Sequence, residues 1–287
     1  MPITGAARLA GIMGWPIAHS RSPALHGFWL QEYGIDGAYV PLAVAPEKLE
    51  QALRALPALG FRGCNLTIPH KQAALSIMDR VDEFAQRIGA MNTVVIAPDG
   101  SLEGSNTDVF GFRENLREQA PSWSAASGPA VVLGAGGAAR SVVAALTAAG
   151  IAEIRLANRT RDRASSLARD LAVPEARITV CPWEQRGEAL SGAGILVNTT
   201  SLGMEHEPQL EIDLAALPAS AIVVDIVYVP LETGLLAAAR GRGNQAVDGL
   251  GMLLHQGRPG FAAWFGSAPQ VTPALRHAML ATFAPAH

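Results

Sequence analysis

A lysine and the polar residues before it form a segment suited to proton transfer. The run NLTIPHK ends an apolar stretch, and alternation along a strand directs Asn65 and Thr67 to one face, with Lys71 just beyond. The chain has 20 Arg but only two Lys, and an ammonium can release a proton where a guanidinium cannot. Asp108, at the end of the run SNTD, could orient that amine, although its position also suits the N-cap of a helix over 109–119.

Two hydroxyls near the N-terminus have the spacing of a small anion site. In the run HSRSP, Ser20 and Ser22 precede a predicted helix, whose dipole would help them hold a carboxylate. Ser22 is equally suited to an N-cap with Pro23 at the first helical position, which would leave Ser20 as a loop residue. Both interpretations are open. The run GAMNT, with Asn92, adds a further polar cluster.

A glycine turn dominates the second half of the chain. GAGGAAR begins at Gly134, between a β-branched run and a helix of small residues. This context indicates a pyrophosphate held at a helix N-terminus, and the alternative is tight strand-to-helix packing. The next strand ends at Asn158-Arg159-Thr160, and an Arg in place of the acid typical of NAD enzymes favours NADP. Arg161 and Arg163 are either further phosphate ligands or solvated helix residues.

These residues need strands and helices in alternation to position them. Apolar runs predict strands over 9–13, 39–44 and 61–68, and a helix over 46–56. In the second half they predict strands over 153–157, 178–181, 195–197 and 222–226, with a helix over 161–171. The residues from Asp248 on predict two helices, and the Pro-Ser-Gly-rich stretch 120–129 marks a candidate boundary. The pattern predicts an α/β fold with βαβ units and largely parallel sheets.

Composition excludes several function classes. The chain has 287 residues, 49% of them hydrophobic and 16% charged, which excludes a disordered chain. The net charge of −3 gives no reason to expect a nucleic-acid partner. No strongly apolar run reaches 18 residues, so we expect no membrane span, and the lack of a basic segment at the start favours the cytoplasm. The histidines at 19, 26, 70 and 255 and the two cysteines lack metal-ligand spacing, so no metal is expected.

In combination, the segments resemble the shikimate dehydrogenase family. HSRSP is similar to its paired-serine motif, NLTIPHK to its catalytic-lysine motif, and GAMNT and SNTD to its substrate-hydroxyl segments. GAGGAAR and NRT resemble its NADP turn and phosphate clamp, and NTTSLGM, DIVYVPLET and DGLGMLLHQG complete the series. The resemblance covers nearly the whole chain in order. It implies a substrate domain of residues 1–107 with 249–287, with a mostly parallel sheet, and a Rossmann-type NADP-binding domain of residues 108–248.

The resemblance also implies residue roles. Lys71 and Asp108 would form the catalytic pair. The substrate would be bound by Ser20, Ser22, Thr67, Asn92, Tyr228 and Gln256. The cofactor would be bound by Gly134, Ala135, Gly136, Gly137, Ala138, Asn158, Arg159, Thr160, Thr199, Ile226 and Gly249.

The implied reaction is reversible hydride transfer between NADPH and the C3 carbonyl of 3-dehydroshikimate, giving shikimate. Quinate or aminoshikimate is an alternative substrate, because a pocket may discriminate weakly between rings that differ by one substituent. A ligand-sensing regulator on the same fold is the alternative from another class. That reading predicts a lost Lys/Asp pair or an attached DNA-binding segment, and neither is seen. A small-molecule substrate is the expected partner, and a homodimer remains open.

Overall fold

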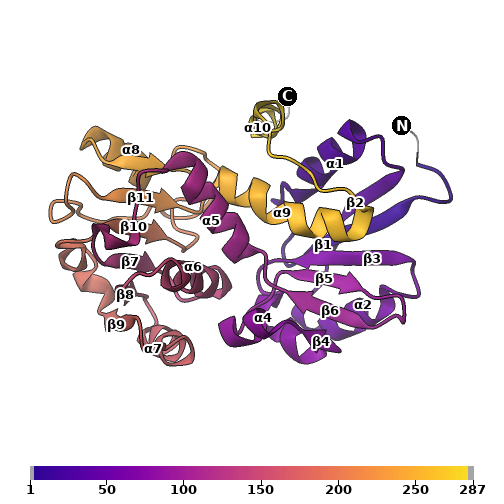
Figure 1. Ribbon diagram of the computed structural model, residues 1–287, viewed down its shortest axis with the longest axis horizontal. Coiled ribbons are helices and arrows are strands. Elements are labelled where there is room, and N and C mark those ends of the chain that lie inside the picture. Colours follow the sequence, from indigo (N-terminus) through magenta and orange to yellow (C-terminus); the bar gives the residue numbers. More distant parts are fainter. Residues whose placement is uncertain (1–2, 284–287) are drawn as a thin grey trace. The chain divides into compact units, whose positions relative to one another are not determined.

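The computed structural model describes residues 3–283, which divide into two compact units (Figure 1). Unit 1 contains the described residues up to Thr107 and those from Leu253 on, and unit 2 spans Asp108–Met252. The Pro-Ser-Gly-rich stretch 120–129 therefore lies inside unit 2, after its first helix. No helix among residues 3–283 is long and apolar enough to cross a bilayer.

Unit 1 contains a six-stranded sheet in the order β2-β1-β3-β5-β6-β4. The strands are β1 (Arg8–Gly14), β2 (Gly37–Ala43), β3 (Phe61–Leu66), β4 (Arg80–Val81), β5 (Thr93–Ile96) and β6 (Leu102–Ser105). β1 pairs in parallel with β2 and β3, and β4 with β6, whereas β5 is antiparallel to both of its neighbours. The β5–β6 pair is antiparallel because a short turn joins the two strands, and a connection this short cannot link parallel strands.

The helices of unit 1 are α1 (Ser22–Glu32), α2 (Leu49–Ala55), α3 (His70–Ala73), α4 (Glu83–Ile88), α10 (Pro273–Ala281) and most of α9 (Leu250–Phe265). The C-terminal helices return to this unit: the Trp264 indole N–H donates to the Val94 carbonyl (3.0 Å) and the Trp29 indole to the Gln270 carbonyl (3.1 Å). Segments far apart in the sequence thus build unit 1.

One local prediction in unit 1 is wrong, and two have the right element with different bounds. Ser22 is not an N-cap: Arg21 holds that position without a side-chain cap, and Ser22 is the first residue of α1. The helix predicted over 46–56 is a 3₁₀ turn, Pro46–Lys48, followed by α2. The strand predicted over 61–68 ends at Leu66, because the chain turns before Pro69 into α3.

Unit 2 contains a fully parallel sheet in the order β12-β11-β10-β7-β8-β9. Its strands are β7 (Ala130–Leu133), β8 (Glu153–Ala157), β9 (Arg177–Cys181), β10 (Ile195–Asn198), β11 (Ile222–Asp225) and β12 (Gln245–Val247). Its helices are α5 (Asp108–Gln119), α6 (Gly137–Ala148), α7 (Arg161–Asp170) and α8 (Gly234–Gly241). Counted from β7, the order is that of the Rossmann fold, and the strand order reverses between β7 and β10.

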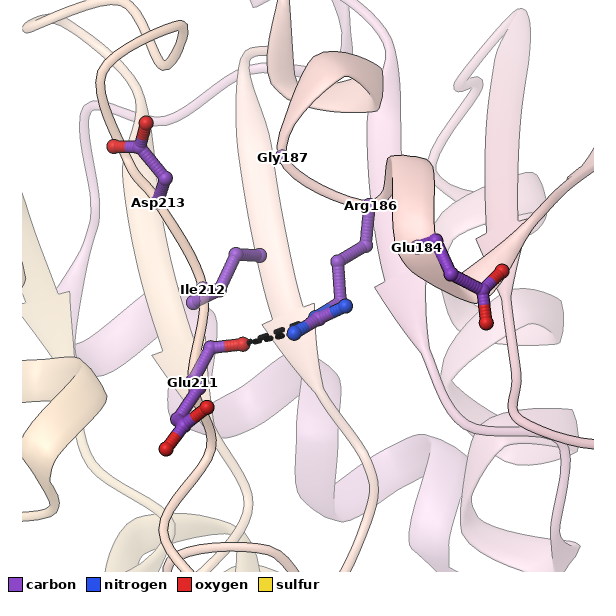
Figure 2. A pocket seen from close by; sticks show the side chains of 6 residues that line it. All are labelled: Glu184, Arg186, Gly187, Glu211, Ile212 and Asp213. Atoms are coloured by element: carbon purple, nitrogen blue, oxygen red, sulfur yellow. Dashed lines mark hydrogen bonds between the residues drawn. The ribbon is translucent and has the colours of Figure 1, made fainter.

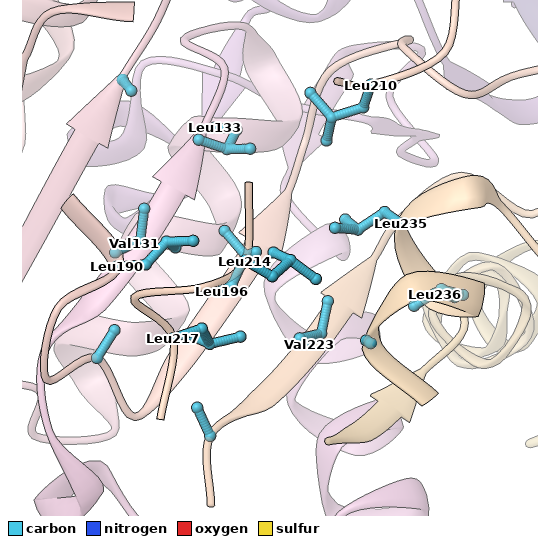
Figure 3. Packing of buried hydrophobic residues seen from close by; sticks show 14 of the residues in the cluster. Val131, Leu133, Leu190, Leu196, Leu210, Leu214, Leu217, Val223, Leu235 and Leu236 are labelled. Carbon is cyan, nitrogen blue, oxygen red and sulfur yellow. The ribbon is translucent and has the colours of Figure 1, made fainter. Parts of the chain in front are cut away.

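A leucine-rich cluster fills one side of the unit 2 sheet (Figure 3). Leu133 and Leu196 on the central strands are fully buried, and the loop residues Leu210, Leu214 and Leu217 pack onto them. Strands buried on both faces read as continuous apolar runs, which explains why the sequence predicts β10 and β11 to within a residue. α5 begins at Asp108 itself, so Asp108 lies inside the helix and not at its N-cap.

Candidate active site

A connected set of buried amides and hydroxyls lies in unit 1, around the ends of β3 and β5. The side-chain nitrogen of Asn65 donates to the Asn92 carbonyl (3.0 Å) and to the Thr93 hydroxyl (3.1 Å). The Asn92 side-chain nitrogen donates to Gln256 Oε1 (3.1 Å) and to the Thr107 hydroxyl (3.0 Å). All five side chains are less than 9% exposed. We call these five residues the amide network.

Asn92 is the centre of the amide network. Its Oδ1 accepts from the backbone N–H of Thr107 (2.7 Å) and from the hydroxyls of Thr107 (3.1 Å) and Thr93 (3.2 Å). Because so many bonds converge on one amide, its orientation is fixed. The network thus brings together two of the predicted substrate residues, Asn92 and Gln256, from positions 164 residues apart.

The paired serines behave differently from each other. Ser20 is half-buried, and its hydroxyl accepts from the backbone N–H of Ser22 (3.3 Å). Ser20, and not Ser22, therefore has a side chain that accepts from a backbone N–H at the start of α1. Ser22 is only 3% exposed and is the first residue of α1. Nearby in the sheet, the Tyr39 phenol donates to Asn65 Oδ1 (2.7 Å), which joins Tyr39 to the amide network.

Thr67 and Lys71 follow β3 at the edge where these polar groups gather. Both are half-buried: Thr67 lies just past the strand, and Lys71 is the second residue of α3. The backbone holds this turn, since the His70 N–H donates to the Thr67 carbonyl (2.8 Å) and the Met91 N–H to the Lys71 carbonyl (2.8 Å). His70 is buried and its Nε2 contacts the Val44 carbonyl (2.8 Å), which makes it a packing residue.

The glycine turn of unit 2 follows β7. At Gly134, φ is +112° and a Cβ would lie 2.5 Å from Thr199 Oγ1, so the fold itself requires glycine there. At Gly136, φ is −90° and a Cβ would meet nothing within 4 Å, so the fold does not require glycine. The turn also leaves the start of α6 without a side-chain cap. The open space at Gly136 lies beside the N-terminal N–H groups of α6, and this arrangement allows a pyrophosphate to approach the backbone closely.

The segment after β8 presents the predicted phosphate clamp. Arg159 and Thr160 are exposed, while the half-buried Asn158 donates from its side chain to the Thr160 carbonyl (2.8 Å) and so shapes the turn into α7. Arg161 and Arg163, the first and third residues of α7, are also exposed. The Arg159 guanidinium therefore reaches solvent beside a helix N-terminus, as a 2′-phosphate ligand must.

A buried carboxylate organises the far side of the unit 2 site. Asp225, fully buried at the end of β11, accepts from the Asn198 side chain (3.0 Å), the Val227 N–H (3.0 Å) and the Thr233 hydroxyl (2.7 Å). Burial raises the pKa of Asp225 to about 6, against the lowering effect of these three hydrogen bonds.

The other residues predicted to line the nicotinamide side follow the same strand ends. Thr199 continues from β10 and its hydroxyl donates to the Leu133 carbonyl (2.6 Å). Ile226 and Tyr228 follow Asp225, and both are half-buried. Gly249 is tightly packed: a Cβ there would lie 2.4 Å from the Ile226 carbonyl oxygen. Unit 2 thus brings Thr199, Ile226 and Gly249 to the carboxyl edge of its sheet.

One open pocket of about 420 Å³ in unit 2 involves none of the predicted site residues (Figure 2). It lies by Glu184, Arg186 and Glu211, and the Arg186 Nε donates to the Glu211 carbonyl (3.0 Å). The same guanidinium lies over the Trp183 ring, 4.7 Å from its centroid, so it already interacts with a carbonyl and an aromatic ring of the pocket's surroundings. Within residues 3–283, no cluster of three His, Cys, Asp or Glu could hold a metal ion.

The fold and these two sets of residues define a nicotinamide-dinucleotide dehydrogenase with a separate substrate unit. Family models agree: residues 12–94 match the shikimate dehydrogenase substrate binding domain, and residues 116–228 match shikimate / quinate 5-dehydrogenase. The chain belongs to the shikimate dehydrogenase family.

Named relatives and solved structures are similar over nearly the whole chain. The shikimate dehydrogenase (NADP(+)) of Paramagnetospirillum magneticum is 61% identical over 96% of this chain and 98% of that protein. The Thermus thermophilus enzyme, solved with NADP(H) and shikimate, is 39% identical with a TM-score of 0.82, covering 95% of this chain and 98% of that one. The quinate dehydrogenase of Corynebacterium glutamicum, solved with NAD, is 33% identical with a TM-score of 0.88, covering 96% and 99%.

Sequence reasoning missed Tyr39 and did not connect Asn65 with Asn92. Asn is scarce, with seven in the chain, so two of them near strand ends were a usable signal for the amide network. Tyr39 gave no such signal, because an aromatic residue in a strand is ordinary packing in most sheets.

Proposed function

We propose that this chain catalyses reversible hydride transfer between NADPH and the C3 carbonyl of 3-dehydroshikimate, giving shikimate. The observation that supports this best is the amide network of unit 1, whose buried donors and acceptors suit a small ring with several hydroxyls. A site that hydrogen-bonds substrate hydroxyls rejects analogues that lack them, since its own polar groups would stay unpaired. The family at 61% identity supports the same reaction.

We propose that the residues have the roles that the family resemblance implies. Ser20 and Ser22 bind the ring carboxylate, and Thr67, Asn92 and Gln256 bind ring hydroxyls or the carboxylate edge. Tyr228 also binds the substrate. Lys71 and Asp108 act on the reacting oxygen: the Lys71 ammonium donates a proton as the carbonyl becomes an alcohol, and Asp108 orients the amine.

NADP fits the residues of unit 2. Bound there, the cofactor supplies the hydride, while the protein orients the cofactor and supplies one proton. The room at Gly136 and the uncapped start of α6 accept the pyrophosphate, with Gly134, Ala135, Gly137 and Ala138 completing the turn. Arg159, with Asn158 and Thr160 around it, holds the 2′-phosphate, while Thr199, Ile226 and Gly249 line the nicotinamide side.

A spectrophotometric assay tests the proposal. The purified chain is given NADP with shikimate, quinate or aminoshikimate, and then NAD with the same acids. We expect the highest kcat/KM with shikimate and NADP. Preference for quinate with NAD, the pair named for the Corynebacterium structure, would instead assign that reaction. No turnover with any acid, together with measurable binding, would favour a ligand-sensing regulator.

Further properties follow from the same proposal. We assign substrate binding to residues 1–107 with 249–287, and NADP binding to residues 108–248. The chain acts in the cytoplasm on a small-molecule substrate without a nucleic-acid partner, in keeping with its net charge of −3. We propose a homodimer as its assembly, which light scattering coupled to size-exclusion chromatography would test.

A further inference from the structure

Tyr39 bonds to the amide network from the edge strand of the unit 1 sheet. It lies on β2, at the edge of the sheet, and is 6% exposed. Its hydroxyl donates to Asn65 Oδ1 on β3 (2.7 Å), although β1 lies between the two strands. Tyr39 pairs with Ala10 on β1, and the small side chain of Ala10 leaves room for the phenol to cross toward β3.

The phenol is held in place by aromatic rings. The His26 ring stacks on it with centroids 3.9 Å apart and planes 2° from parallel, and the Trp264 ring lies 6.0 Å away. Burial lowers the pKa of His26 to about 3, so the stacked ring stays neutral. Neither His26 nitrogen makes a hydrogen bond within the described part of the chain, which leaves packing as the role of this ring. The Tyr39 hydroxyl therefore occupies a fixed position.

That hydroxyl determines how the Asn65 amide points. With Oδ1 committed to the phenol, the side-chain nitrogen must face the Asn92 carbonyl and the Thr93 hydroxyl, and both bonds are present. Burial raises the pKa of Tyr39 well above its usual value, so the phenol keeps its proton and remains a donor. Without it, Asn65 Oδ1 would be buried with its main donor gone, which favours rotation of the amide.

The Asn65 amide carries this orientation to the rest of the amide network, because its nitrogen bonds Asn92 and Thr93, and the Asn92 side chain bonds Gln256. We propose that Tyr39 is a positioning residue of the substrate site, which fixes the Asn65 amide and, through it, the arrangement of the amide network that would bind ring hydroxyls. This inference rests on the proposed function of unit 1.

Tyr39→Phe tests it, because the ring and its stacking on His26 are kept and only the hydroxyl is lost. We expect the KM for shikimate to rise about tenfold, the KM for NADP to stay unchanged, and kcat to fall less than KM rises. Tyr33→Phe is the matched control: its hydroxyl accepts from the Gln270 N–H (3.2 Å), outside the amide network, so its KM values should match those of the wild type.

A double-mutant cycle distinguishes positioning from general loosening. If Tyr39 acts through Asn65, the Tyr39→Phe and Asn65→Ala pair should raise KM by less than the product of the single effects. An unchanged or lower KM in Tyr39→Phe, or equal changes in the KM values for shikimate and NADP, would overturn the proposal. All ratios are measured with whichever ring acid the wild type turns over, so an error in the assigned substrate leaves the test of Tyr39 intact.

Discussion

The two units build their sites by opposite means. Unit 1 uses side chains: amides and hydroxyls of Asn65, Asn92 and Gln256 bond one another in a buried network. Unit 2 relies on backbone groups. Its turn has open space at Gly136, where there is no side chain, and backbone N–H groups without a side-chain cap at the start of α6. A pyrophosphate is the same in every dinucleotide, so backbone suffices to hold it, whereas a polyhydroxylated ring must be distinguished from close analogues. We therefore expect substrate specificity to depend on unit 1.

The largest expected effect falls on the lysine of unit 1. Lys71→Ala should lower kcat by about 10²–10⁴, because a proton donor at the reacting oxygen acts mainly in the transition state. The KM for shikimate should change much less, since the serines and the amide network provide ground-state binding. Lys71→Arg should fail nearly as badly, because a guanidinium keeps its proton. Kinetics at saturating NADP and shikimate measure this, and near-normal kcat in Lys71→Ala would eliminate the proton-donor role.

The contrast between the units also explains what could be read from the sequence. The site of unit 2 is local: a strand, a glycine turn and a helix occur consecutively, and Arg159 ends the next strand. The amide network of unit 1 joins residues distant in sequence, such as Asn92 and Gln256, and no local sequence pattern predicts the hydrogen bond between their side chains. Ser22 shows the limit most directly. Its type and position suit an N-cap, but Arg21 holds that position, and the buried Ser22 is the first residue of the helix.

Acid should affect the two units in opposite directions. The pKa of His26 in unit 1 falls from 6.5 to about 3, so the unfolded state binds more protons between these values and unit 1 loses stability as pH falls below 6.5. That loss approaches about 5 kcal/mol near pH 3. The pKa of Asp225 in unit 2 rises from 3.8 to about 6, so its contribution is present below pH 4 and is lost as pH rises through 6.

Hydrogen exchange at pH 7 and pH 4.5 can separate these responses. Peptides from α1 and β2 should lose protection at the lower pH relative to peptides from β10 and β11. His26→Phe should flatten the acid loss in unit 1, because a neutral ring replaces one that protonates on unfolding. Asp225→Asn should remove the opposite slope in unit 2. Parallel loss of protection in both units, unaltered by either substitution, would contradict this account.

Arg159 tests whether unit 2 has any side-chain specificity of its own. Arg159→Ala should raise the KM for NADP roughly ten- to a hundredfold, since a charge-assisted hydrogen bond to phosphate contributes about 1.5–3 kcal/mol. The KM for NAD, which lacks the 2′-phosphate, should change much less. Arg163→Ala is a suitable control, because that side chain is also exposed but lies further into α7. Equal losses with both cofactors would assign Arg159 a structural role.

Two glycines of the same turn should respond differently to one added methyl group. Gly136→Ala should leave the melting temperature unchanged, since φ is −90° and the space is open, but raise the KM for NADP about tenfold by crowding the pyrophosphate. Gly134→Ala should instead lower the melting temperature, because φ is +112° and Thr199 Oγ1 lies in the way. A normal KM in Gly136→Ala would remove the pyrophosphate from this position.

The smallest effect is expected at a glycine of unit 1 that serves neither site. Gly27 lies within α1, is exposed, and a Cβ there would meet nothing within 4 Å. Gly27→Ala should therefore raise the free energy of unfolding by about 0.5–1 kcal/mol, as alanine restricts the unfolded chain and favours the helix. Gly257→Ala in α9 should do the reverse, because its Cβ would lie 3.0 Å from Leu25 Cδ2 and 3.2 Å from the Trp29 ring. Urea denaturation measures both. Kinetic constants should be normal in Gly27→Ala, and a raised KM there would show that the exposed side of α1 contributes to binding.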